Sequence, residues 1–115
     1  MATDLERLAN EFQQELLDTY TEAKIKCRYN ASRFFQMLEE HGGVETARRL
    51  LSEGSVMQTG LAELWKCGRL DISVEAKVLI PKYQPLFSAA LRDNAKRRLQ
   101  EYRFDIEAWF KQFHN

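Results

Sequence analysis

The chain has 115 residues, 44% of them hydrophobic, with only five glycines and two prolines. This length allows one domain that is stable without metals or disulfides, and the composition favours helices over β-turns. The 17 basic and 17 acidic side chains cancel, which excludes a global field that would hold a polyanion or an anionic membrane. We predict an all-α, single-domain helical bundle in which two long terminal helices flank several short ones.

Two cysteines, Cys27 and Cys67, stand at apolar positions of helical patterns, without CxxC spacing. We expect them to be buried, reduced thiols of a cytoplasmic protein. The segment 1–12 is charged within its first six residues and has no apolar run, so it resembles neither a signal peptide nor an anchor. No window approaches the roughly 18 apolar residues of a membrane span, and no membrane partner is predicted.

The first predicted helix begins at Thr3 or Asp4, either of which can cap its opening turn. Apolar residues recur at steps of three or four from Leu5 to Cys27, a stripe about six turns long. A row of acids lines the outer face and is expected to be solvated: Glu11, Glu15, Asp18 and Glu22.

Two shorter helices are predicted next, over 31–40 and 44–51, with Asn30 as the cap of the first. The segment His41-Gly42-Gly43 separates them, and one glycine is expected to take the left-handed conformation that ends a helix. His41 is interpreted as a helix-terminal group, because no Cys or carboxylate stands at metal-ligand spacing from it.

The stretch 59–87 is expected to be the structural hub. Thr59 caps a two-turn helix that ends at Gly68. Three apolar residues of this helix are predicted to share its buried face: Leu61, Leu64 and Trp65.

A second short helix of the hub is capped by Ser73 and cannot continue past Pro81. Arg69 and Asp71, at the corner before this helix, are close enough for a mutual ion pair. We interpret the corner as mainly structural, with ligand contact as the alternative.

Ser88 caps the last predicted helix, whose apolar stripe runs from Leu91 to Phe113 without a Gly or Pro. The favoured prediction is one helix over 88–113. The alternative is a separate final helix capped by Asp105.

The segments RYNASRFFQMLEEHGGVETARRLL and GLAELWKCGRLDISVEAKVLIPKYQPLF carry a distinctive pattern. They resemble a small helical domain, recurring in many bacterial proteins, with the pattern YNxxRFxQMLxxHGGVExAxRLL and then GxxxLWxxGRLDLTVEAxVLxPxYxxLF. The resemblance covers about 29–102, and it implies no activity, cofactor or site residue.

An aromatic extension, residues 103–115, runs past the part that resembles this domain. Its large apolar side chains are the candidate protein-interaction residues: Phe104, Trp109, Phe110 and Phe113. Additional apolar surface at a terminus indicates either a protein partner or closer packing with the first helix.

No catalytic motif is present in the sequence. The serines lie in caps or loops and not in a GxSxG elbow. Gly42-Gly43 lacks the Lys-Ser/Thr of a phosphate-binding loop, and the adjacent Glu39 and Glu40 point to different helix faces. We therefore predict no enzyme, no cofactor, no metal and no small-molecule substrate.

Basic side chains form two groups that are candidate contacts for nucleic acid or an acidic partner. They are Lys24, Lys26, Arg28 and Arg33 in the first group, and Arg92, Lys96, Arg97, Arg98 and Arg103 in the second. If both groups faced one side they would neutralise several phosphates. The alternative is that they pair with the acidic first helix.

The leading hypothesis is a non-enzymatic helical interaction subunit, adaptor or regulator of a larger bacterial or phage-related assembly. Its partner would be a protein, in a homo-oligomer or a larger complex. The alternative is a nucleic-acid-binding accessory module of a defence or mobile-element complex, which would use the two basic groups.

Overall fold

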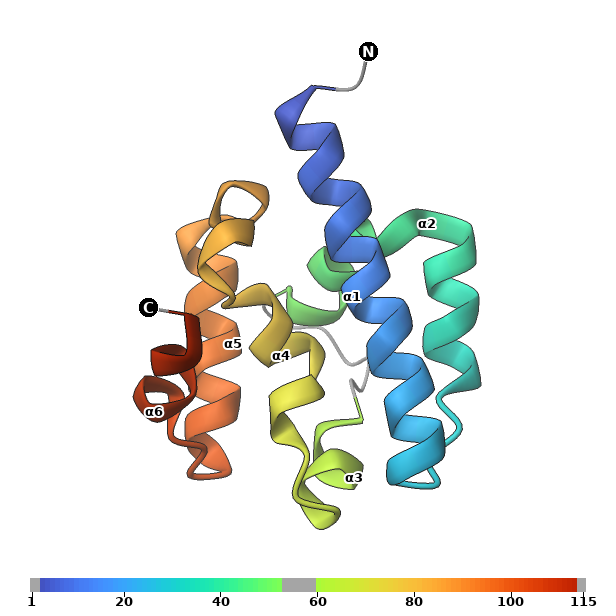
Figure 1. The fold of residues 1–115 in the computed structure, drawn as a ribbon, viewed down its shortest axis with the longest axis vertical. Coiled ribbons are helices and arrows are strands. Elements are labelled where there is room, and N and C mark those ends of the chain that lie inside the picture. The colour runs from blue at the N-terminus through green and yellow to red at the C-terminus, as the bar shows by residue number, and fades with distance from the viewer. Residues whose placement is uncertain (1–2, 53–59, 114–115) are drawn as a thin grey trace.

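The computed structural model describes residues 3–52 and 60–113, which contain helices and no strand. The all-α prediction is confirmed. The helices are, in chain order, α1 (Asp4–Lys26), α2 (Ser32–Leu51), α3 (Leu61–Lys66), α4 (Val74–Val78), α5 (Ala89–Glu101) and α6 (Ile106–Phe110). Three short 3₁₀ helices join them: η1 (Leu70–Ile72), η2 (Pro81–Leu86) and η3 (Lys111–Phe113). Figure 1 shows α1 and α2 on one side, α5 and α6 on the other, and α4 between them.

The two longest helices, α1 and α2, pack against each other. The Thr3 hydroxyl accepts a hydrogen bond from the Glu6 backbone N–H at 3.1 Å, so the predicted cap is present. Gly43 lies where the two helices cross. A Cβ added there would stand 2.7 Å from the Cα of Gln13, and the glycine therefore permits an approach that a side chain would prevent.

The second helix differs from its prediction. It runs through the expected break, with a kink at Gly42, whose φ of 78° and ψ of 170° are not helical. One glycine does take a positive φ, as predicted, but His41 lies inside the element and not at its end. The expected Asn30 cap is wrong, because the helix begins at Ser32 and the Asn30 side chain accepts from the Tyr20 hydroxyl at 3.2 Å.

The core lies between α1, α2, α4, η2 and α5. Phe12 is fully buried at its centre, with its ring edge-on to Tyr83 at 5.2 Å and to Phe87 at 4.9 Å between centroids. These contacts fix η2 against α1. The hub prediction agrees with this arrangement, since most residues from Leu70 to Phe87 are buried.

The helix α3 departs from prediction on its apolar face. Leu61 and Leu64 are buried, but Trp65 is 53% exposed and leans on Tyr102 at 5.8 Å between ring centroids. Gly68 ends the element with a φ of 72°, as predicted. The proposed cap Thr59 lies outside the described residues.

The two cysteines form a disulfide, Cys27–Cys67, with 5.7 Å between the Cα atoms. The prediction of two buried, reduced thiols is therefore wrong. Cys27 follows the last turn of α1 and Cys67 follows the last turn of α3. The pairing depends on how these two helix ends meet, which neither local sequence indicates. Cys67 is exposed.

The last predicted helix, over 88–113, is two helices and not one, so the alternative prediction is confirmed. The first ends at Glu101, Arg103 has a φ of 58°, and the Asp105 carboxylate accepts from the Ala108 N–H at 3.0 Å. The chain reverses at this break, and α6 packs on α5. The described part of the extension, with α6 and η3, thus packs on the far side of the molecule from α2 and does not lie along the first helix (Figure 1).

Candidate interaction groove

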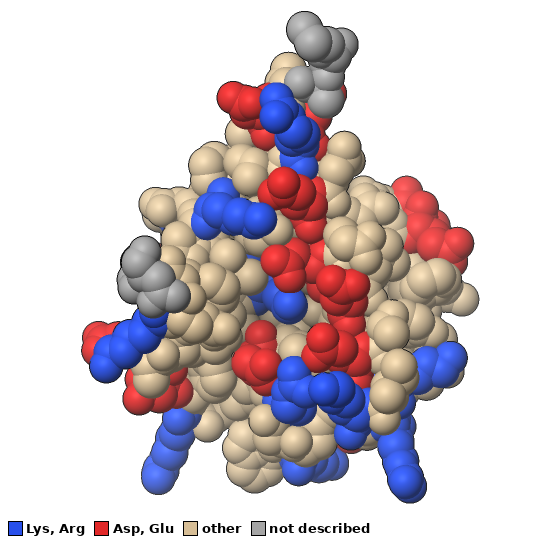
Figure 2. All heavy atoms as spheres, in the orientation of Figure 1, with Lys and Arg blue, Asp and Glu red and all other residues tan. Residues whose placement is uncertain are grey.

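Three of the four acids in the row on α1 are engaged in ion pairs, which corrects the prediction of a solvated face, whereas Asp18 is exposed and accepts a hydrogen bond from the Gln14 amide. Glu15 lies 2.8 Å from Lys77, Glu11 lies 3.2 Å from Lys82, and Glu22 lies 2.9 Å from Arg69. Figure 2 shows the acidic side chains in a band along this face, with basic side chains beside it. The partners come from the hub, and not from the two basic groups proposed in the sequence.

The Arg69 corner forms a closed ion-pair network. The guanidinium donates to both Asp71 oxygens at 3.0 and 3.1 Å and to Glu22 at 2.9 Å. The hydrogen bonds that Arg69 donates to Asp71, followed by the negative charge of Asp71 and by Glu22, raise the pKa of Arg69 against the opposing effect of burial. The predicted ion pair is confirmed, and it joins α1 to the corner before α4.

Tyr83 donates its hydroxyl proton to Glu15 at 3.1 Å from an almost fully buried ring. Burial, and then the negative charge of Glu15, raise the pKa of Tyr83 above its ordinary value of 10. The folded state thus favours the neutral phenol.

Because of this shift, we expect the free energy of unfolding to fall as the pH rises above about 10. The contribution of Tyr83 is complete below the pKa of an unfolded tyrosine and is lost as the pH approaches the higher folded value. Tyr83→Phe should cost about 1 kcal/mol at neutral pH and flatten the decline at high pH. Urea unfolding across this range measures both, and a variant profile parallel to the wild type above pH 10 would contradict the expectation.

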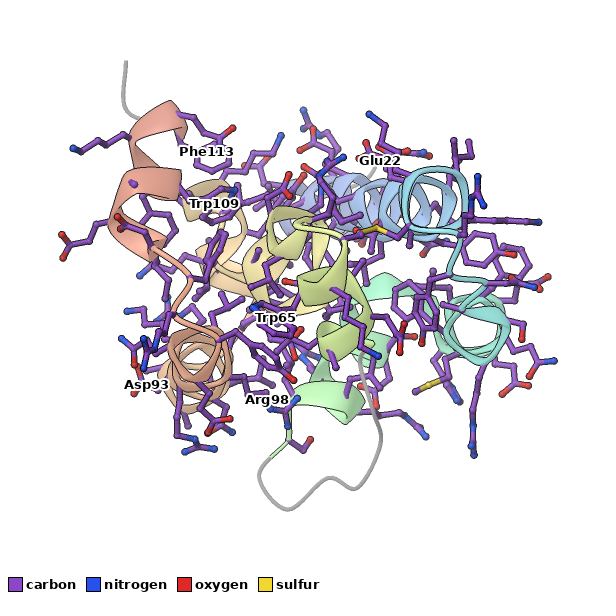
Figure 3. All side chains as sticks on the ribbon, turned by 90° about the horizontal axis from the view of Figure 1, so that it is seen from below. Glu22, Trp65, Asp93, Arg98, Trp109 and Phe113 are labelled. Atoms are coloured by element: carbon purple, nitrogen blue, oxygen red, sulfur yellow. A yellow bond between two sulfur atoms is a disulfide. The ribbon has the colours of Figure 1, made fainter. Side chains whose placement is uncertain are left out.

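The two basic groups do not share a face. The group from Lys24 to Arg33 surrounds the α1–α2 junction, and the other lies on or just after α5. Figures 1 and 3 place these on opposite sides of the molecule, with α3 and α4 between them.

The members of the two groups also differ in exposure. Arg98 points inward, donates to the Leu50 carbonyl at 2.9 Å and lies 3.4 Å from the buried Glu75 carboxylate, so it is a structural residue. Arg92 is half-buried. The remaining members are exposed: Lys24, Lys26, Arg28, Arg33, Lys96, Arg97 and Arg103.

A groove of about 350 Å³ lies where η2, α5 and α6 meet. Its floor is the apolar run Val78, Leu79, Ile80 and Pro81, of which Pro81 is exposed and the other three are buried. Phe110, from α6, forms an aromatic wall. The polar residues that line it are Gln84, Arg92, Asp93 and Lys96. Apolar walls with a few convergent polar groups are typical of binding sites of this size.

The rim of the groove is cationic. Arg92 and Lys96 stand four residues apart on α5, which places them on one helix face, and neither has an ion-pair partner among residues 3–52 and 60–113. Asp93 is the one carboxylate among the lining residues. The groove therefore presents apolar surface beside a net positive charge.

The aromatic extension builds this wall from its own cluster. Trp109 lies at the centre, with ring centroids 5.4 Å from Phe110, 5.0 Å from Phe113 and 6.1 Å from Phe104. Figure 3 shows Trp109 and Phe113 side by side on the α6 side of the molecule. Of the predicted interaction residues, Phe110 lines the groove, and the other three support it or lie beside it.

Arg92 and Lys96 were predicted as basic contacts and Phe110 as an apolar contact, and the fold brings these three residues to one groove. The floor of the groove was not predicted. The available signal was the uninterrupted apolar run from Val78 to Pro81, because it is longer than one buried face of a helix requires.

No protein-family model, no curated protein and no solved structure matches the chain. Within the described part of the chain, no group of three or more His, Cys, Asp or Glu side chains is placed to hold a metal ion. Nor does any helix of that part combine the length and apolarity needed to cross a membrane.

Proposed function

We propose that the protein is a non-enzymatic interaction subunit that holds an acidic, apolar segment of a protein partner in the groove beside Phe110. The observation that carries this proposal is the apolar floor next to two cations that lack a carboxylate partner within the described residues. Most of the other charged side chains that face the hub are already used in ion pairs, as at Glu15 and Arg69. In the groove, apolar surface lies beside cations that have no ion-pair partner among the described residues.

A peptide experiment tests this function. A labelled helical peptide of leucine and glutamate should bind the wild-type protein, whereas the same peptide with lysine in place of glutamate should not. Lys96→Glu should weaken binding about fivefold, since an exposed ion pair is lost and a repulsion is added. Phe110→Ala should weaken it further by removing the wall. Fluorescence anisotropy measures each affinity.

Arg97→Glu is the matched control for this experiment. Arg97 is exposed on the same helix but does not line the groove, so its reversal changes the net charge equally and should leave binding within about twofold of the wild type. Equal binding of the acidic and basic peptides, or equal effects of the two reversals, would contradict the proposal.

The nucleic-acid alternative has less support. It required both basic groups on one side, and they lie on opposite sides with Arg98 turned inward. A duplex or single strand bound by either group alone would make few phosphate contacts.

The proposed setting is the cytoplasm, within a bacterial or phage-related assembly. The Cys27–Cys67 disulfide counts against this location, because disulfides persist mainly in oxidising compartments. Alkylation of the thiols in intact cells, before and after reduction, distinguishes the two redox states.

A further inference from the structure

We propose that the partner segment is the first turn of α1 from a second copy of this chain, so that two copies exchange their amino-terminal turns between grooves. The inference rests on the proposed function of the groove and names its occupant. Three observations support it: the amino-terminal end of α1 projects from the molecule, Leu5 on its first turn is exposed, and this turn and the groove rim have opposite net charges.

The first turns of α1 project beyond the rest of the molecule (Figure 1). Leu5 is 56% exposed there, whereas one turn later Leu8 and Ala9 are half-buried against the core, and full burial begins at Phe12. A helix end that projects without packing is marginal in water, since most helix stability in proteins comes from the burial of an apolar face. This turn therefore presents a leucine that is more than half exposed.

The charge of this turn complements the groove. Asp4 pairs with Arg7 at 3.1 Å, while Glu6 has no ion pair among the described side chains, so the turn is net negative. The groove rim is net positive through Arg92 and Lys96. Leu5 on the apolar floor with Glu6 toward these cations would satisfy both parts of the site.

Each copy carries both halves of the contact. A two-fold arrangement would therefore form two identical contacts. The result is a closed dimer to which no third copy can add, as is usual for homodimers. Each contact is small, and small interfaces are typical of weak, concentration-dependent association. We expect a dimer in the micromolar range.

Sedimentation of the full chain at several concentrations tests the inference. The wild type should change from monomer to dimer as the concentration rises, and Leu5→Asp should shift the equilibrium to monomer. Ile25→Asp is the matched control, because Ile25 is 71% exposed at the opposite end of the same helix. It should dimerise like the wild type. A monomeric wild type, or equal losses from Leu5→Asp and Ile25→Asp, would overturn the proposal.

Charge exchange gives a readout that misfolding cannot produce. Glu6→Lys and Lys96→Glu should each weaken self-association about fivefold or more. A mixture of the two variants should dimerise again, because the lysine of one copy meets the glutamate of the other in both contacts. No recovery in the mixture would overturn the two-copy arrangement.

The two proposals fail separately. If the wild type stays monomeric but binds the leucine–glutamate peptide, the groove keeps its function and this occupant is wrong. If it neither dimerises nor binds the peptide, both proposals are wrong.

Discussion

Reduction of the Cys27–Cys67 disulfide is expected to lower the free energy of unfolding by about 4 kcal/mol. The bond joins residues 40 apart in the sequence. Closing a loop of that length removes chain entropy from the unfolded state, which corresponds to about 4 kcal/mol in the chain-entropy model. The exposure of Cys67 gives a thiol reductant direct access to the bond. Urea unfolding with and without reductant measures the difference.

The loss should be concentrated where the bond acts. It ties the end of α1 to the end of α3, a helix of six residues that is too short to stand alone. Amide exchange over 61–66 should therefore accelerate more than exchange in α4 when the bond is reduced. The double variant Cys27→Ser with Cys67→Ser is the control and should not respond to reductant. A wild type that unfolds at the same urea concentration in both conditions would contradict this prediction.

Helix starts were the most predictable part of the fold, because a cap is a local event. Thr3, Ser73 and Ser88 each accept from a backbone N–H three residues later, as their sequence positions indicated. The predicted Asn30 cap was wrong because of a tertiary contact: the Asn30 side chain accepts a hydrogen bond from Tyr20 on α1 and does not cap α2. The break after α5 could not be preferred on sequence, since the positive φ falls on Arg103 and not on a glycine.

The pairing of distant residues was the least predictable part. The acidic row of α1 was visible in the sequence, but its partners Lys77 and Lys82 lie more than sixty residues away. The same limit applies to the groove. Arg92 and Phe110 were singled out for different reasons, and they meet only because the chain reverses after Tyr102. Side-chain chemistry identified the groups, and the topology decided which of them converge.

Arg98→Met is expected to lower the free energy of unfolding by about 3 kcal/mol, the cost typical of breaking one buried ion pair. Glu75 is fully buried on α4, and its carboxylate lies 3.4 Å from Arg98. The same guanidinium donates to the Leu50 carbonyl near the end of α2 at 2.9 Å. Methionine keeps the apolar stem, so the loss reports the charge and the hydrogen bond. The residue thus joins α2, α4 and α5 at one point.

Two comparisons show whether the loss of free energy of unfolding comes from the contacts of Arg98 with Glu75 and Leu50 or from the removal of any arginine. Arg97→Met removes an exposed neighbour on the same helix and should change the free energy of unfolding by less than about 0.5 kcal/mol. Glu75→Gln combined with Arg98→Met should be less destabilised than the sum of the single variants, because the loss of the Arg98 cation matters less beside a neutral amide than beside a carboxylate. Chemical unfolding of the wild type, of Glu75→Gln, of Arg98→Met and of the double variant gives the coupling energy. Strict additivity, or equal losses at Arg97 and Arg98, would show that Arg98 does not hold the three helices together through Glu75.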